Sequence, residues 1–182
     1  EVSAAHGGRA HAVLNAAGVL HDAALTPETS LSRVDPAQLE RSFRVNAVGP
    51  LLVSQAFAPL LAAASAGREA GDTALPVVAS LSARVGSIQD NRLGGWYSYR
   101  ASKAAQNQLS RCMAIDMARR KGREVVVLAL HPGTCDTDLT RPYQRNVAPE
   151  KLFTRERGAS QLLGLIDGAT LEHSGGFYDW AG

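Results

Sequence analysis

Tyr99 and Lys103 are the two residues whose types and spacing could transfer a proton. They lie in YSYRASK, residues 97–103, at the start of a stretch whose apolar residues recur every three or four positions, which predicts a helix over about 98–120. Positions four apart share one helix face, so Tyr99 and Lys103 would be neighbours and Tyr97 would point elsewhere. An ammonium beside a phenol favours the phenolate, so we expect Lys103 to lower the pKa of Tyr99. Taken alone, this spacing is more often that of a surface pair.

Length and composition indicate one soluble domain. The chain has 182 residues, 45% of them hydrophobic, which is enough for a core, and we expect residues 1–182 to form a single domain. A net charge of +2, with both signs interspersed, argues against nucleic acid as a partner. We expect no membrane-spanning segment, since no long apolar run stands out. Cys112 and Cys135 form no disulfide framework and favour a reducing, cytoplasmic location.

Short apolar segments alternate with helical patterns along the chain. The segments that resemble buried strands are 10–18, 74–82, 123–133 and, more weakly, 175–180. The helical patterns cover 36 to about 64, 98–120 and 155–168, whereas 62–73 is rich in Ala and Gly and is interpreted as a loop. This alternation predicts an α/β fold, a Rossmann-like parallel sheet with flanking helices and right-handed crossovers. Ligands would lie at the carboxyl ends of its strands.

Three signals fall near those strand ends. The first strand closes on Asn15-Ala16-Ala17-Gly18, small residues that let a ring or sugar approach the backbone. The third closes on Pro132-Gly133, which forces a turn, and Thr137 follows with a hydroxyl and an amide to offer. Pro50, inside a helical pattern, has no N–H for the carbonyl of Asn46, and that free carbonyl could hold a water that relays protons. Each signal alone is also compatible with an ordinary turn or kink.

Together these features resemble the short-chain dehydrogenase/reductase family. The likeness covers nearly the whole chain, from Asn15-Ala16-Ala17-Gly18 through Asn46 and Tyr99-x-x-x-Lys103 to Pro132-Gly133 and Thr137. LSARVGSIQDNRLGGWYSYRASKAA and GGFYDWAG are most similar to the C-factor and sniffer-like carbonyl reductase branch. The resemblance implies hydride transfer between NADP(H), or alternatively NAD(H), and a small carbonyl or alcohol substrate. It also implies a homo-oligomer when the protein is full length.

The same resemblance implies roles for individual residues. Tyr99 would protonate the carbonyl oxygen, Lys103 would lower the phenol's pKa and bind the nicotinamide ribose, and Asn46 would anchor the relay water. The residues expected to bind the cofactor are Asn15, Ala16, Ala17, Gly18, Tyr99, Lys103, Pro132, Gly133 and Thr137.

Two departures from the family pattern stand out. Ala83 occupies the position where the family usually carries its catalytic serine, and Ser82 or Ser87 would have to replace it. Ser82 is slightly favoured, although neighbouring side chains of a strand face opposite ways. The family's glycine-rich turn, TGxxxGxG, would lie upstream of residue 1, so the chain is expected to be the C-terminal part of a dinucleotide-binding fold, lacking the first strands. As an isolated fragment it would be inactive and would bind NADPH weakly.

Two other classes of function stay open. One is a non-catalytic, reductase-like module that acts by association with subunits or partners. The other is a hydrolase using Cys135 and His131, which is less favoured because no orienting third group accompanies the pair. We expect no metal site, since Asp136 and Asp138 lack a third ligand.

Overall fold

A four-stranded parallel sheet forms the centre of the molecule. The computed structural model describes residues 7–69, 71–119 and 124–182. The strand order is β1-β2-β3-β6, and every neighbouring pair is parallel. The strands are β1 (Ala12–Asn15), β2 (Val77–Leu81), β3 (Val126–His131) and β6 (Phe177–Asp179). The predicted α/β fold with a Rossmann-like parallel sheet is therefore confirmed.

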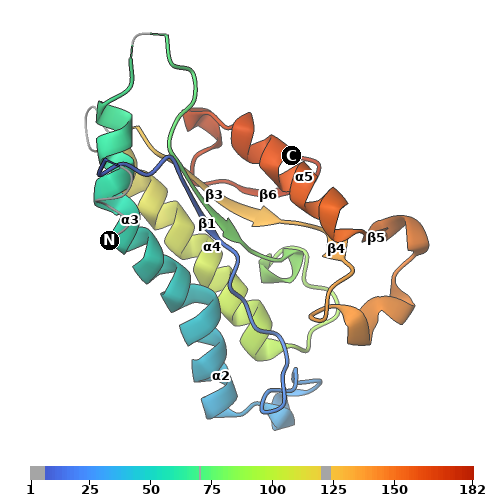
Figure 1. Ribbon diagram of the computed structural model, residues 1–182. Helices are drawn as coiled ribbons and strands as arrows, with labels where there is room; N and C mark the ends of the chain where they lie inside the picture. Colours follow the sequence, from blue (N-terminus) through green and yellow to red (C-terminus); the bar gives the residue numbers. More distant parts are fainter. Residues whose placement is uncertain (1–6, 70, 120–123) are drawn as a thin grey trace.

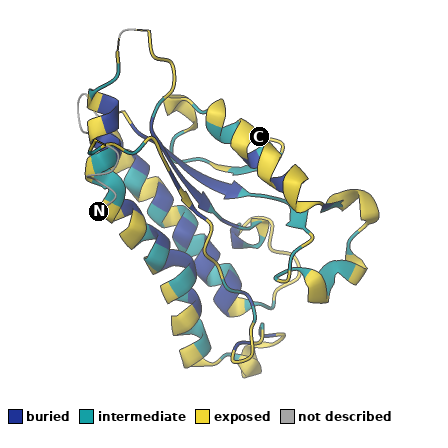
Figure 2. Ribbon diagram, in the orientation of Figure 1, coloured by how far each residue is buried: buried dark blue, intermediate teal, exposed yellow. Residues whose placement is uncertain are grey.

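Helices cover both faces of this sheet (Figure 1). On one face lie α2 (Pro36–Phe43), α3 (Gly49–Ala66) and α4 (Tyr97–Ala118), and on the other lies α5 (Arg155–Asp167). The alternation of β2 explains the two cores: Val78 packs with Leu61 and Met117 beneath α3 and α4, whereas Val77 and Ala79 pack with Leu162 of α5. Figure 2 shows β2 and β3 buried between helices whose outer faces are exposed, whereas the edge strand β1 alternates between exposed and buried residues.

The first long helix is continuous but not uniform. Asp35 caps its start by accepting a hydrogen bond from Gln38 N at 2.9 Å. A π-helical turn, Arg44–Val48, separates α2 from α3, so the irregularity predicted at Pro50 lies just before that residue, which occupies the first turn of α3. The predicted loop at 62–73 begins too early, because alanine is the best helix former and α3 continues to Ala66.

This helix also bears on the expectation about membranes. From Pro36 to Ala66 it is long and apolar enough to cross a bilayer by length and composition alone. This apolar stretch was overlooked in the sequence, because alanine and leucine supply its apolar character without an obvious uninterrupted run; whether it meets a membrane stays a prediction. In the fold the segment packs against α4, β1 and β2 as an ordinary layer helix.

The start of α4 is fixed by a distant segment of the chain. Glu28, which lies between β1 and α2, accepts hydrogen bonds from the Ser98 backbone N–H, at 3.2 Å, and from the Ser98 hydroxyl. Trp96 precedes the helix with a left-handed φ of 51°, and its N–H donates to the Glu28 carbonyl at 2.5 Å. A segment far from α4 in sequence therefore sets where this helix begins.

Short elements complete the sheet's carboxyl edge. After β2, the 3-10 turn η3 (Arg84–Gly86) packs on α4 so tightly that a Cβ on Gly86 would lie 2.9 Å from Lys103. After β3, Gly133 turns the chain with a φ of +76°. The other short elements are η1 (Leu31–Arg33), β4 (Thr134–Cys135), η4 (Arg141–Asn146), η5 (Pro149–Lys151), β5 (Leu152–Phe153) and η6 (Leu171–His173), with β4 and β5 pairing in parallel.

Candidate active site

Tyr99 and Lys103 lie together inside the protein near the start of α4. The Lys103 Nζ is 5.9 Å from the centroid of the Tyr99 ring. Tyr99 is 9% exposed and Lys103 is 3% exposed, whereas Tyr97 is 38% exposed. The helix prediction and the shared face are confirmed, and burial rules out an ordinary surface pair.

The ammonium of Lys103 is held by two acceptors on the protein. Its Nζ donates to the Leu81 carbonyl at 2.7 Å and to Gln106 Oε1 at 3.0 Å, and Gln106 Nε2 donates to the same carbonyl at 3.2 Å. Burial lowers the pKa of Lys103 to about 8, so the ammonium form still predominates at neutral pH. The sequence reasoning missed Gln106, although its position three residues after Lys103 placed it on the same helix face.

The pKa of Tyr99 moves in the direction opposite to the one predicted. Burial raises the pKa of Tyr99 to about 12, because removing a phenolate from water is unfavourable. The Lys103 ammonium donates to Leu81 and Gln106 rather than to the phenol, and burial is the cause that sets the direction of the Tyr99 pKa. The phenol therefore carries its proton at neutral pH.

Asn46 clamps the segment that follows β1. Its side chain is fully buried: Oδ1 accepts from Val19 N at 2.7 Å, and Nδ2 donates to Val19 O at 2.9 Å and to Ser102 Oγ at 3.0 Å. These bonds fasten the loop after β1 to α4, next to Lys103. The predicted relay water on the Asn46 carbonyl stays a prediction, and that carbonyl lies in the π-helical turn.

The four residues Asn15 to Gly18 divide into two groups. Asn15 is buried and donates to Pro50 O, Ser54 Oγ and Ser80 Oγ at 3.1–3.3 Å, so its side chain ties β1 to α3 and β2. Residues 16–18 are exposed.

Gly18 lies in front of the buried ammonium of Lys103 at this edge. A Cβ on Gly18 would lie 3.5 Å from Lys103 Nζ and 3.7 Å from Asn46 Oδ1. We call the exposed backbone of Ala16, Ala17 and Gly18 the ledge. A side chain at Gly18 would occupy the space in front of the Lys103 ammonium. This arrangement of an exposed small-residue ledge and a buried donor fits the hydroxyls of a cofactor sugar.

The residues after β2 are less favourable for catalysis by a serine. Ser82 is buried and its hydroxyl donates to Asn107 Oδ1 at 2.6 Å, on the α4 side of the sheet that the alternation of β2 predicts. The Ser82 hydroxyl proton, which would be needed to orient a substrate carbonyl, is therefore already donated to Asn107. Ser87 is partly exposed, and its Oγ accepts from Asp90 N at 3.3 Å. Ala83, between strand and turn, supplies no hydroxyl.

The turn after β3 has structural partners of its own. A Cβ on Gly133 would lie 2.6 Å from the Phe153 ring, which explains glycine there. Thr137 N donates to Thr140 Oγ1 at 3.3 Å, and Thr137 Oγ1 lies 3.5 Å from Cys135 O. Both groups that Thr137 was expected to offer a ligand are thus engaged, although weakly.

Aromatic rings from three segments gather beside Tyr99. The Trp96 ring lies 6.3 Å from the Tyr99 ring and 4.8 Å from the Tyr143 ring of η4, and His21 lies 5.9 Å from Tyr143. The segments 87–96 and 139–153 therefore meet beside Tyr99 through the rings of Trp96 and Tyr143.

The cysteine hydrolase alternative is disfavoured. Burial lowers the pKa of His131 to about 4 and raises the pKa of the Cys135 thiol, so neither a general base nor a thiolate is favoured. The Cys135 Sγ instead lies 3.5 Å from Pro132 O. His131 lines a separate, polar pocket of about 290 Å³ between η3 and β6, together with Arg84 and Asp179.

Comparisons with known proteins show which sequences this chain is similar to. Residues 1–148 match the family model described as short chain dehydrogenase. The chain is 40% identical to the C-signal protein of Myxococcus xanthus over 153 residues, which cover 84% of this chain and 81% of that protein. It is 36% identical to the 1-hydroxy-2-glutathionyl-2-methyl-3-butene dehydrogenase of Rhodococcus sp. (strain AD45), covering 87% of this chain and 63% of that enzyme.

Solved structures share the fold. The carbonyl reductase Sniffer of D. melanogaster superposes with a TM-score of 0.81 at 24% identity, covering 100% of this chain and 68% of that one. An NADPH-bound carbonyl reductase from chicken fatty liver gives 0.80 at 27% identity, with the same coverage. The predicted family resemblance is confirmed by the family model and the C-signal protein, and these structures confirm its fold.

Proposed function

Because the chain belongs to the short-chain dehydrogenase family, we propose that it is an oxidoreductase that transfers a hydride between NAD(P)H and a carbonyl or alcohol substrate. The proposal rests on the buried pair Tyr99 and Lys103, in which Lys103 Nζ lies 5.9 Å from the centroid of the Tyr99 ring. This pair lies behind the exposed ledge of Ala16, Ala17 and Gly18. A nicotinamide cofactor, when bound, supplies the hydride. The chain supplies the proton and the binding surface.

Tyr99 acts as the proton donor to the carbonyl oxygen. With a pKa near 12, the phenol is protonated at neutral pH, the state that a general acid requires. In the ligand-free chain little phenolate is therefore present at neutral pH to act as the base for the reverse oxidation. Trp96 and Tyr143 would border the substrate, because their rings contact each other next to Tyr99.

The remaining binding groups follow from their positions at the sheet edge. Lys103 would donate to the ribose hydroxyls across Gly18, and Pro132, Gly133 and the Thr137 loop would complete the nicotinamide side. The Asn15 side chain would contribute indirectly, by fixing β1. NADP(H) is preferred over NAD(H) by analogy with the NADPH-bound carbonyl reductase, which is 27% identical to this chain.

A second candidate is a non-catalytic reductase-like module. Ala83 at the usual serine position and the bond from Ser82 to Asn107 both favour it, since together they leave the developing negative charge with one donor fewer. Such a module would act by association, through the exposed Leu52 and Val53 of α3 and Ile115 of α4. The same helices would join the subunits of a homo-oligomeric enzyme.

Organisation and location complete the proposal. Residues 1–182 would form a single domain, the C-terminal part of a larger dinucleotide-binding unit. A cytoplasmic location agrees with the two free cysteines, Cys112 and Cys135.

The test compares two lengths of protein. Residues 1–182 alone are expected to bind NADPH weakly and to show no turnover, because orientation of the nicotinamide depends on further contacts. A longer protein that includes a glycine-rich βαβ unit should reduce aldehydes, and Tyr99→Phe should nearly abolish this while NADPH binding, followed by nucleotide fluorescence, is retained. If Tyr99→Phe kept half of the rate, Tyr99 would not be the acid. No turnover in the longer protein would support the non-catalytic module.

A further inference from the structure

Gln106 occupies an unusual position for a polar side chain. It is 2% exposed and lies on the inner face of α4, toward α3 and the sheet, where a leucine or methionine would add to the apolar core. Both ends of its amide are used: Oε1 accepts from Lys103 Nζ at 3.0 Å, and Nε2 donates to the Leu81 carbonyl at 3.2 Å. Lys103 Nζ donates to that same carbonyl, so Lys103, Gln106 and Leu81 O form a closed triangle of hydrogen bonds.

We propose that Gln106 is a positioning residue for Lys103, which holds the ammonium between the end of β2 and the ledge at Gly18. The proposal rests on the proposed function in one respect only, the use of Lys103 toward a cofactor. The hydrogen-bond triangle itself exists in the chain without any ligand.

Gln106 supplies a side-chain acceptor to the Lys103 ammonium. No ion pair among the described residues includes Lys103. The Tyr99 phenol, whose ring centroid lies 5.9 Å from Nζ, has a raised pKa and is neutral. The hydrogen bonds to Leu81 O and Gln106 Oε1 therefore offset part of the cost of burying the Lys103 ammonium. Leu81 O is backbone and cannot vary, so Gln106 is the side chain through which the sequence controls the ammonium.

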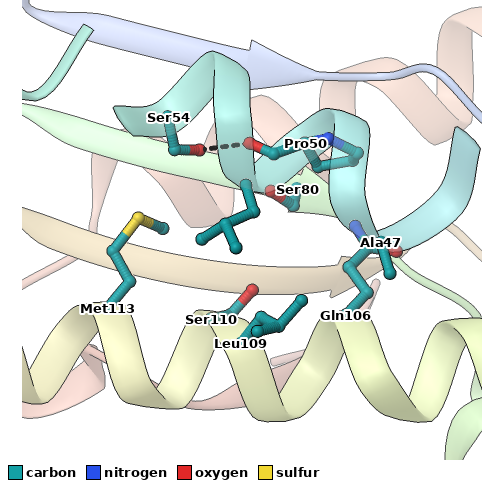
Figure 3. Close-up of a pocket in the computed structure, with 9 residues that line it drawn as sticks. Ala47, Pro50, Ser54, Ser80, Gln106, Leu109, Ser110 and Met113 are labelled. Atoms are coloured by element: carbon teal, nitrogen blue, oxygen red, sulfur yellow. Dashed lines mark hydrogen bonds between the residues drawn. The ribbon is translucent and has the colours of Figure 1, made fainter. Parts of the chain in front are cut away.

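A small cavity beside Gln106 allows its role to be separated from packing. The cavity has a volume of about 10 Å³ and lies between α3, α4 and β2, room for about one water. Figure 3 shows Gln106 at one end, with Ser110 and Met113 further along the same helix. Ser110 is 5% exposed and lines the same cavity. It does not belong to the hydrogen-bond triangle, because Lys103 Nζ donates to Leu81 O and to Gln106 Oε1. Ser110→Ala is thus a matched control that alters the cavity without touching the triangle.

The experiment measures the pKa of Lys103 by NMR titration of its side chain in the ligand-free chain. The sequence contains three lysines, Lys103, Lys121 and Lys151, and loss of a signal in Lys103→Arg assigns the resonance. Gln106→Leu should lower the Lys103 pKa by about one unit, the equivalent of one hydrogen bond to a charged group. Gln106→Glu should raise it by about one unit, because it keeps the acceptor and adds an opposite charge. Ser110→Ala should leave it unchanged.

The outcomes decide the proposal without any enzyme assay. An unchanged Lys103 pKa in Gln106→Leu, or a change equal to that of Ser110→Ala, would reduce Gln106 to a core residue. If Gln106→Leu does not fold, Gln106→Glu decides by the same measurement. In a longer protein that turns over substrate, Gln106→Leu should raise KM for the cofactor more than it lowers kcat. Absence of turnover would count against the proposed function and leave the titration result standing.

Discussion

Removal of the Glu28 carboxylate should destabilise the fold far more than removal of an ordinary helix cap. Glu28 is 3% exposed, and its carboxylate accepts hydrogen bonds from the backbone N–H and the hydroxyl of Ser98 at the start of α4. Ser98 is itself 2% exposed, so no bulk water can replace the lost acceptor in Glu28→Ala.

The magnitude follows from these bonds. A hydrogen bond to a charged group contributes about 1.5–3 kcal/mol, and a buried donor left unpaired costs about as much as that contribution. We therefore expect Glu28→Ala to lower the free energy of unfolding by about 3 kcal/mol. The control is Asp35→Ala, since Asp35 caps α2 from an exposed site within its own turn and its loss should cost about 1 kcal/mol.

Urea unfolding followed by far-UV circular dichroism gives both values. The m-values should stay equal, because the surface exposed on unfolding hardly changes. A double-mutant cycle with Ser98→Ala should then return a coupling of about 1 kcal/mol or more for the contact of Glu28 with the hydroxyl. Equal losses for Glu28→Ala and Asp35→Ala would refute the reasoning, because the distant cap would then be no stronger than a local one.

Two further predictions concern the carboxyl edge of the sheet. In a longer protein that turns over, Ser87→Ala should lower kcat by the equivalent of about 2.7–4 kcal/mol if Ser87 supplies the missing hydroxyl, whereas Ser82→Ala should act on stability through its bond to Asn107; two near-neutral rates would exclude both serines. The His131 pKa near 4 lies below the unfolded value of about 6.5, so the unfolded chain binds a proton that the native state does not. The free energy of unfolding should therefore fall by up to about 3 kcal/mol as the pH drops from about 6.5 to 4. His131→Gln should flatten that part of the pH profile in urea unfolding, and an unchanged slope would contradict it.

Sequence periodicity predicted the strands, the helices and the shared face of Tyr99 and Lys103, because each depends on residues close along the chain. It could not predict the cap by Glu28, which is 70 positions from Ser98. The direction of the Tyr99 pKa also depended on three-dimensional burial, which outweighed a lysine four residues away. Ser82 illustrates the same limit, since its partner Asn107 is 25 positions distant. Family likeness located the chemistry, but only tertiary contacts revealed which groups were already engaged.

The bond between Asn15 and Ser80 selects one alignment of β1 against β2. The two residues are partners in the parallel pairing, and Asn15 Nδ2 lies 3.1 Å from Ser80 Oγ. A slip of one residue would turn the buried Val13 and Asn15 outward. A slip of two toward the amino end of β2 would preserve that orientation but would set the buried amide of Asn15 beside Val78, whose side chain accepts no hydrogen bond. Apolar patterning alone would tolerate that second arrangement, so this amide and hydroxyl widen the energy gap between the native sheet and its closest misaligned competitor.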